Sequence, residues 1–134
     1  YMWPFSSKKK ILLVEDSDSL AKAAMLALED AGFHVIRCSS FDEAIKKLMK
    51  RGKYTAIWID HWLSGNKTGI DVLDVVRSMR RYKDIPVFVI SASTDDHDRD
   101  QYEQLNIVKY YTKAEETLGT IIKEVTEHLG VTEK

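Results

Sequence analysis

The sequence predicts an α/β fold, a doubly wound five-stranded parallel sheet with helices on both faces. Five short apolar runs alternate with segments of helical periodicity, which is the pattern that repeated βα units produce. The length of 134 residues corresponds to one domain. Among the doubly wound strand orders, the flavodoxin-like order 2-1-3-4-5 suits five strands, and its topological switch lies between the first and third strands.

The five strands are expected at residues 11–14, 34–38, 55–59, 87–90 and 108–111. The first, third and fourth runs are continuously apolar, as strands covered on both faces should be, so these three are predicted to be central. Right-handed crossovers then place helices on both faces of the sheet. The one cysteine, Cys38, is expected to be a small buried residue, and its lack of an intrachain partner fits a reducing compartment.

Five helices are expected in the intervals. The first ends before Gly32, Ser40 and Glu43 have capping-box spacing for the second, and the third covers about 70–80. The fourth, about 96–105, is very polar. The apolar stripes expected to face the core are Leu20, Ala23, Ala24, Ala27, Leu28 and Ala31 in the first helix, Ala44, Ile45, Leu48 and Met49 in the second, Leu73, Val76 and Met79 in the third, and Leu118, Ile121, Ile122, Val125 and Leu129 in the last.

Composition and charge limit the function classes. The chain has 20 Lys+Arg against 21 Asp+Glu, a net charge of −1, and no basic stripe, which argues against nucleic acid or an anionic membrane as the main partner. No apolar stretch approaches a membrane span and no secretion signal precedes the domain, so a soluble, cytoplasmic protein is expected. Residues 1–8 are interpreted as a tail or linker, 9–131 as the domain and 132–134 as a C-terminal tail.

Carboxylate, hydroxyl or ammonium side chains follow four of the five predicted strands. Glu15 and Asp16 follow the first, Asp60 the third, Ser91 the fourth and Lys113 the fifth. The carboxyl ends of parallel strands share one edge, so these side chains should converge beside the topological switch. Three converging carboxylates repel one another unless a cation lies between them, and an all-oxygen pocket suits Mg²⁺. With the ammonium and the hydroxyl, the pocket suits a carboxylate that receives a phosphoryl group.

Residues 10–129 resemble a response-regulator receiver domain, the phosphoacceptor of two-component signalling. The motifs are ILLVED at 11–16, WID at 58–60, VISA at 89–92 and YYTK at 110–113. The resemblance implies a signalling domain rather than an enzyme, in which Asp60 takes a phosphoryl group from a phosphohistidine. The donor would be a sensor histidine kinase or a phosphotransfer protein.

The resemblance also implies the roles of the other residues. Asp16 and Asp60 would bind Mg²⁺ directly with the backbone carbonyl of Trp62, and Glu15 would act through a water. Lys113 would pair with Asp60 and then with the phosphoryl group.

The switch residues follow from the same resemblance. Ser91 would move toward the phosphate and Tyr110 would turn inward behind it, whereas Tyr111 would face the other way in the core. The output surface would be the fourth helix, fifth strand and fifth helix, which is also a candidate homodimer face.

Several residues depart from the family pattern. Ala114 replaces the proline that usually follows the lysine in a cis bond, so this bond is either trans or strained. Ser64 replaces another proline, and the loop 64–69 is one residue longer and expected to be looser. Trp62 either shields the acyl phosphate from water or is an exposed loop aromatic, and Ser93 is expected to leave its side of the site open.

Other side chains are expected to lie outside the site. His61 should point away from the site or into solvent, and the acidic run Asp95, Asp96, Asp98 and Asp100 should form a solvated helix face. Ala21 and Met25 are expected to be exposed, where they could meet a kinase helix.

Three alternatives remain open. A degenerate receiver would keep the fold and serve as a docking or dimerisation module, which Ala114 and the altered loop favour. A phosphatase of the haloacid-dehalogenase type would use Asp16 of the DSDSL run as its nucleophile, but it leaves Asp60 without a role. A flavodoxin-like nucleotide binder lacks the phosphate-binding loop that it would need.

Overall fold

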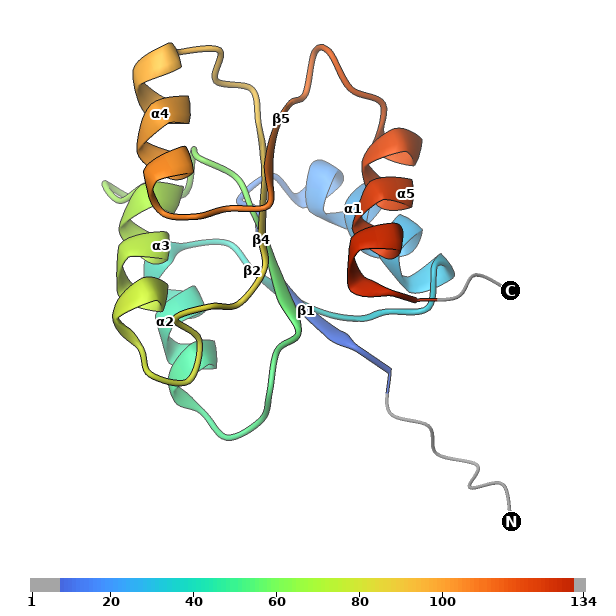
Figure 1. Cartoon of the computed structure of the whole chain (residues 1–134), viewed down its shortest axis with the longest axis horizontal. Helices are drawn as coiled ribbons and strands as arrows, with labels where there is room; N and C mark the ends of the chain where they lie inside the picture. The colour runs from blue at the N-terminus through green and yellow to red at the C-terminus, as the bar shows by residue number, and fades with distance from the viewer. Residues whose placement is uncertain (1–7, 132–134) are drawn as a thin grey trace.

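The computed structural model describes residues 8–131, which form five strands and five helices in strict alternation (Figure 1). The strands are β1 (Lys10–Val14), β2 (His34–Cys38), β3 (Ala56–Ile59), β4 (Val87–Ser91) and β5 (Lys109–Thr112). The helices are α1 (Asp18–Asp30), α2 (Phe41–Met49), α3 (Gly69–Ser78), α4 (Asp96–Gln104) and α5 (Leu118–Leu129). The predicted tails lie outside the described residues, except for Lys8.

The strands form one parallel sheet in the order β2-β1-β3-β4-β5, as predicted. Helices α2, α3 and α4 cover one face, and α1 and α5 cover the other (Figure 1). The continuously apolar strands β1, β3 and β4 occupy the centre, because each has a strand on both sides and helices above and below. In the part of the chain that the structure describes, no helix is long and apolar enough to cross a membrane.

Alternation along each strand divides the interior into two cores. Leu12 of β1 points to the core under α2, α3 and α4, whereas Leu13 points to the core under α1 and α5. Tyr110 and Tyr111 of β5 divide in the same way, so the prediction that Tyr111 faces the other core is confirmed. Both cores reach the carboxyl ends of the strands and hold that edge in place.

Local signals position two of the helices. Ser17 caps α1, its hydroxyl accepting the Leu20 N–H at 3.3 Å. Ser40 caps α2 as expected, with its hydroxyl accepting the Glu43 N–H at 3.2 Å. The Glu43 carboxylate, however, accepts the N–H of Ser39 and not that of Ser40.

Some predicted core positions are wrong. The buried line of α1 runs through Ala21, Ala24 and Leu28, so Ala21 is not exposed, whereas Leu20 is. Neighbouring residues of a helix point about 100° apart. The predicted apolar stripe combined residues that point in different directions, and only some of them face the core. Met49 is exposed for the same reason, one residue beyond buried Leu48. Ala23 is exposed, and Met25 is half-buried against the core.

Candidate functional site

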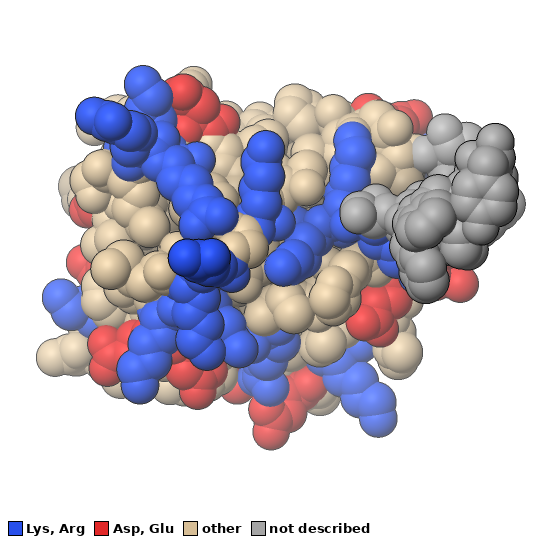
Figure 2. Space-filling view, turned by 90° about the horizontal axis from the view of Figure 1, so that it is seen from below, with Lys and Arg blue, Asp and Glu red and all other residues tan. Residues whose placement is uncertain are grey.

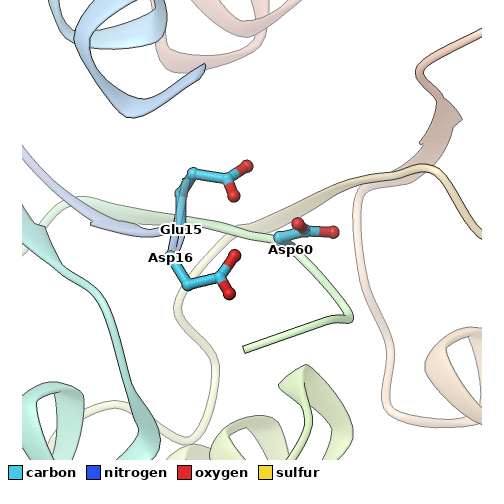
Figure 3. A group of neighbouring side chains, drawn as sticks. All are labelled: Glu15, Asp16 and Asp60. Atoms are coloured by element: carbon cyan, nitrogen blue, oxygen red, sulfur yellow. The ribbon is translucent and has the colours of Figure 1, made fainter. Parts of the chain in front are cut away.

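Backbone hydrogen bonds hold the acidic residues at the ends of β1 and β3. The Glu15 N–H donates to the Cys38 carbonyl and the Asp60 N–H donates to the Val14 carbonyl, both at 2.9 Å. Glu15 and Asp60 are buried, whereas Asp16 is exposed. The three carboxylates each offer an oxygen within 4.8 Å of the others, and Figure 3 shows Glu15, Asp16 and Asp60 around one space. The predicted convergence is therefore present.

Lys113 enters this pocket from the end of β5. Its Nζ donates to Glu15 Oε1 at 3.0 Å and to Asp60 Oδ2 at 3.1 Å. The Lys113 N–H donates to the Ser91 carbonyl at 2.8 Å, which fixes the backbone from which the side chain extends. The Lys113–Ala114 peptide bond is trans. The ammonium therefore reaches Asp60 without the cis proline that the family usually has.

Burial and mutual repulsion set the charge balance of the pocket. Burial, followed by the negative charge of Asp60, raises the pKa of Glu15, against bonds from Ser17 and Lys113 that lower it. Burial also acts to lower the pKa of Lys113, but the Asp60 and Glu15 carboxylates outweigh it and raise the pKa overall. The ammonium is thus held in its charged form, and one fixed cation faces three carboxylates.

One carboxylate oxygen of the pocket, Asp60 Oδ1, carries negative charge that Lys113 does not neutralise. Asp60 Oδ1 is buried and has no hydrogen-bond partner among residues 8–131, whereas Asp60 Oδ2 is held by Lys113. A buried, unpartnered carboxylate oxygen is costly unless a cation or donor meets it. Oxygen donors from two buried residues and one exposed residue are what a hard divalent ion accepts while it keeps its waters. The residues present therefore fit Mg²⁺.

A hydroxyl network lies behind the pocket on the β4 side. Ser91 Oγ accepts the Ser93 N–H at 3.1 Å, and the Tyr110 hydroxyl donates to the Ser93 carbonyl at 2.9 Å. The Tyr110 ring is buried in this arrangement. Ser93 does not leave its side open, because it is itself buried and its Oγ donates to Asp98 Oδ2 at 2.9 Å.

His61 is directed away from the three carboxylates, as one of the two predicted placements had it, but into the interior and not into solvent. It is buried rather than solvated, with Nδ1 at 2.9 Å from the Tyr102 hydroxyl and Nε2 at 3.4 Å from Asp98 Oδ2. The residue therefore joins the loop after β3 to α4. Tyr102, fully buried in an otherwise polar helix, is the anchor that sequence reasoning missed. Its isolation as the one aromatic in α4 is the signal that could have revealed it.

The acidic run of α4 has more than one role. Asp95 caps the helix, because its Oδ1 accepts the His97 N–H at 2.8 Å and the Asp98 N–H at 3.3 Å. Asp96 and Asp100 are exposed, as expected. Asp98 is not part of the solvated face, since it contacts Ser93 and His61.

Arg37 supports the acidic pair and was not anticipated. Its Nε and Nη2 donate to the Glu15 carbonyl at 3.0 and 2.9 Å, and Nη2 also reaches the Asp16 carbonyl at 3.2 Å. Its Nη1 pairs with Asp18 at 2.8 Å. A guanidinium thus fixes the turn that carries the carboxylates. The signal in the sequence was the charged Arg37 within the otherwise mostly apolar run 34–38, which was predicted to be a strand.

Trp62 lies on the loop beside the pocket. Its side chain is 54% exposed and contacts the His61 ring edge to face, with centroids 4.6 Å apart. This exposure supports the interpretation as a loop aromatic. The backbone of Trp62 pairs with that of Thr68, which closes the loop 62–68.

The family model for the response regulator receiver domain matches residues 11–125. The chain belongs to this family. Among curated relatives, the transcriptional regulatory protein AfsQ1 of Streptomyces coelicolor is 32% identical over 88 residues, covering 66% of this chain and 37% of AfsQ1. The phosphate regulon transcriptional regulatory protein PhoB of Escherichia coli is 24% identical, covering 78% of this chain and 45% of PhoB. The receiver domain thus spans less than half the length of these relatives.

Solved structures give the same fold. The phosphorylated cyanobacterial phytochrome response regulator RcpA has a TM-score of 0.80 at 29% identity, covering 96% of this receiver domain and 98% of that chain. A CheY-like receiver domain from Methanospirillum hungatei has a TM-score of 0.82 at 17% identity, covering 92% and 95%. The second likeness shows the fold alone.

Proposed function

We propose that this receiver domain accepts a phosphoryl group on Asp60 from a phosphohistidine of a sensor histidine kinase or a phosphotransfer protein. The observation that carries the proposal is the state of the Asp60 carboxylate, with Oδ2 held by Lys113 and Oδ1 buried and without a partner in the described part of the chain. The likeness to a solved, phosphorylated response regulator supports it. Membership of the response regulator family supports a partnership with sensor kinases.

The transfer needs a nucleophile and neutralisation of phosphoryl charge. An Asp60 carboxylate oxygen attacks phosphorus, a P–O bond forms, and the P–N bond breaks with its electron pair returning to the donor imidazole. Lys113 holds its ammonium against the reacting carboxylate and follows the charge to the phosphoryl oxygens. Glu15, Asp16, Asp60 and the Trp62 carbonyl would hold Mg²⁺, which supplies further neutralisation of phosphoryl oxygens when bound.

Ser91 is proposed as the residue that senses the product. Its hydroxyl accepts the Ser93 N–H and lies at the end of β4, next to the strand that carries Lys113. If Ser91 Oγ moves toward a phosphoryl oxygen to donate its hydroxyl hydrogen, it is drawn away from the Ser93 N–H and releases Ser93. Because the Tyr110 hydroxyl donates to the Ser93 carbonyl, the Tyr110 ring would follow.

Phosphorylation of the isolated domain tests this proposal. We expect incubation with Mg²⁺ and acetyl phosphate to add one phosphoryl mass to the intact chain, with no adduct in Asp60→Asn. Asp18→Asn is the matched control, because Asp18 is exposed and contacts Arg37 rather than the pocket. Asp16→Asn should reduce the yield at low Mg²⁺ and recover at high Mg²⁺. An adduct that persists in Asp60→Asn, or its absence in the parent chain, would contradict the proposal.

The alternatives receive less support. A phosphatase using Asp16 would need an activated nucleophile, whereas Lys113 contacts Asp60 and Glu15 and the Asp16 side chain is exposed. An adduct lost only in Asp16→Asn would favour that class. A degenerate receiver was favoured by Ala114, yet Lys113 reaches Asp60 with a trans bond after it.

A homodimer through the face of α4, β5 and α5 is part of the same proposal. Charged side chains occupy this face, including Lys109, whose Nζ pairs with Glu124 at 2.9 Å across β5 and α5. Exposed charges of both signs can pair across a symmetric interface. Sedimentation velocity should give a larger species after acetyl phosphate than before. An unchanged sedimentation coefficient in a fully phosphorylated sample would exclude this interface as the output.

A further inference from the structure

A basic surface lies at the edge of the sheet where the strands begin, opposite the acidic pocket. Three chain segments form it, at residues 8–10, 50–54 and 80–85. Lys10 Nζ lies 5.2 Å from the centroid of the Tyr54 ring, which joins the first segment to the second. The Tyr82 hydroxyl donates to the Gly52 carbonyl at 3.2 Å and joins the second to the third. The segments therefore form one continuous surface, called the basic face below.

The basic face carries nearly half of the 20 Lys and Arg residues of the chain. Each segment contributes three, namely Lys8, Lys9, Lys10, Lys50, Arg51, Lys53, Arg80, Arg81 and Lys83. Asp84 is the one acidic residue of the three segments. Within residues 8–131, none of the nine cations pairs with a carboxylate, and all but Lys10 are exposed. Figure 2, viewed from this edge, shows the basic side chains gathered across its middle.

We propose that the basic face docks on the surface of an anionic lipid bilayer. Lys and Arg side chains that form no ion pair with a carboxylate and are spread over a face attract a surface of many identical phosphate groups. This attraction needs no bonds to particular atoms. Exposed Met49 adjoins Lys50 and supplies an apolar side chain at the rim, as interfacial binding requires. A net charge of −1 does not prevent this, because the cations are concentrated at one end.

The chemistry of this face favours a bilayer over nucleic acid. Its two aromatic rings, Tyr54 and Tyr82, are buried and cannot stack on bases. The three segments are two helix-to-strand connections and the start of a strand, so they present no helix to a major groove. A lipid surface needs neither feature.

Docking in this orientation leaves the acidic pocket open. The strands run from the basic face to Asp60 and Lys113, so the two ends are separated by the length of the sheet. A bilayer under the basic face would therefore not cover the residues proposed for phosphoryl transfer. The inference goes beyond that function and does not depend on it.

Cosedimentation of the full chain with vesicles tests the inference. We expect binding to phosphatidylcholine vesicles that contain phosphatidylglycerol, little binding to phosphatidylcholine alone, and release as salt is raised. The variant Arg80→Glu/Lys83→Glu should lose roughly tenfold or more in affinity. Lys22→Glu/Lys123→Glu makes the same change in net charge at exposed positions on α1 and α5, and its affinity should stay within about twofold of the parent.

Three results would overturn the inference. One is the absence of binding to the anionic vesicles at low salt, and another is an equal loss in the two double variants, which would indicate net charge alone. Tighter binding to a short DNA duplex than to the vesicles would assign the face to nucleic acid. If Arg80→Glu/Lys83→Glu does not fold by circular dichroism, Lys8→Glu/Lys53→Glu, at two other exposed positions of the face, replaces it.

Discussion

Cys38 illustrates how position sets the chemistry of a single residue. It is fully buried at the end of β2, and burial, with the nearby Glu43 charge, raises the pKa of its thiol to about 11. A raised pKa favours the protonated thiol in the folded state. Folding stability that depends on Cys38 is therefore retained below about pH 9 and decreases as the pH rises toward 11.

The same pKa predicts slow alkylation of Cys38. At pH 8 the folded protein should react with iodoacetamide at least about 100-fold more slowly than the protein in urea, because thiolate is scarce and the side chain is covered. Intact mass measured over time gives both rates. Raising the pH toward 10 should speed the folded reaction without a plateau. Equal rates in the two states would contradict the burial of this thiol.

Gly69 predicts a steric requirement beside the site. A Cβ at this position would lie 2.3 Å from the Tyr102 hydroxyl and 2.5 Å from the Asp60 carbonyl, and the second contact is with backbone. Gly69→Ala should therefore lower the free energy of unfolding by roughly 1–3 kcal/mol. Gly119→Ala in α5 is the matched control, because its Cβ would meet nothing within 4 Å.

Urea denaturation of the two alanine variants measures this difference. Gly119→Ala should be neutral or stabilising, since alanine is the better helix former by about 1 kcal/mol. Equal midpoints for the two variants would mean that Tyr102 and the Asp60 loop can move apart. In that case the tight packing of α4 against the site would not hold.

At the scale of elements, one arginine joins several connections. Arg77, near the end of α3, donates to the carbonyls of Lys83 and Ile85 before β4 at 3.1 and 2.9 Å. It also reaches Leu105 and Asn106 before β5, at 2.8 and 3.2 Å. Asn106 has a positive φ of 61°, a conformation that asparagine tolerates better than most residues.

Removal of this guanidinium should loosen both connections together. Arg77→Met should lower the free energy of unfolding by at least about 2 kcal/mol, because it leaves several carbonyls without donors. Arg80→Met is the control, since Arg80 is exposed and makes no side-chain hydrogen bond within the described residues. Urea denaturation compares the two variants. A loss of similar size in both would show that the bonds of Arg77 are replaced by water at no cost.

The strands were predictable from the sequence, but the polar contacts between elements were not. Buried parallel strands need apolar residues on both faces, so β1, β3 and β4 can be recognised in the sequence as continuous apolar runs. The polar contact of His61 with Tyr102 depends on two side chains 41 positions apart in the sequence. No periodicity links such positions. The acidic pocket was predictable because strand ends converge by topology alone.

At the scale of the whole molecule, charge is separated along the strands. The acidic pocket lies at one end of the sheet and nine cations lie at the other, although the sum is −1. Composition could not reveal this, because the three basic segments are distant in sequence and each is short. Parallel topology brings them together, since every connection that precedes a strand returns to the same edge.

The two adjacent tyrosines of β5 connect this strand to both faces of the sheet. The Tyr110 hydroxyl is anchored to the Ser93 carbonyl on the α4 side, and the Tyr111 hydroxyl donates to Glu124 of α5 at 2.7 Å. Successive side chains of a strand turn together with its backbone. A twist of β5 that freed one hydroxyl would strain the other bond, so a disturbance that began beneath α4 would be passed through β5 to α5.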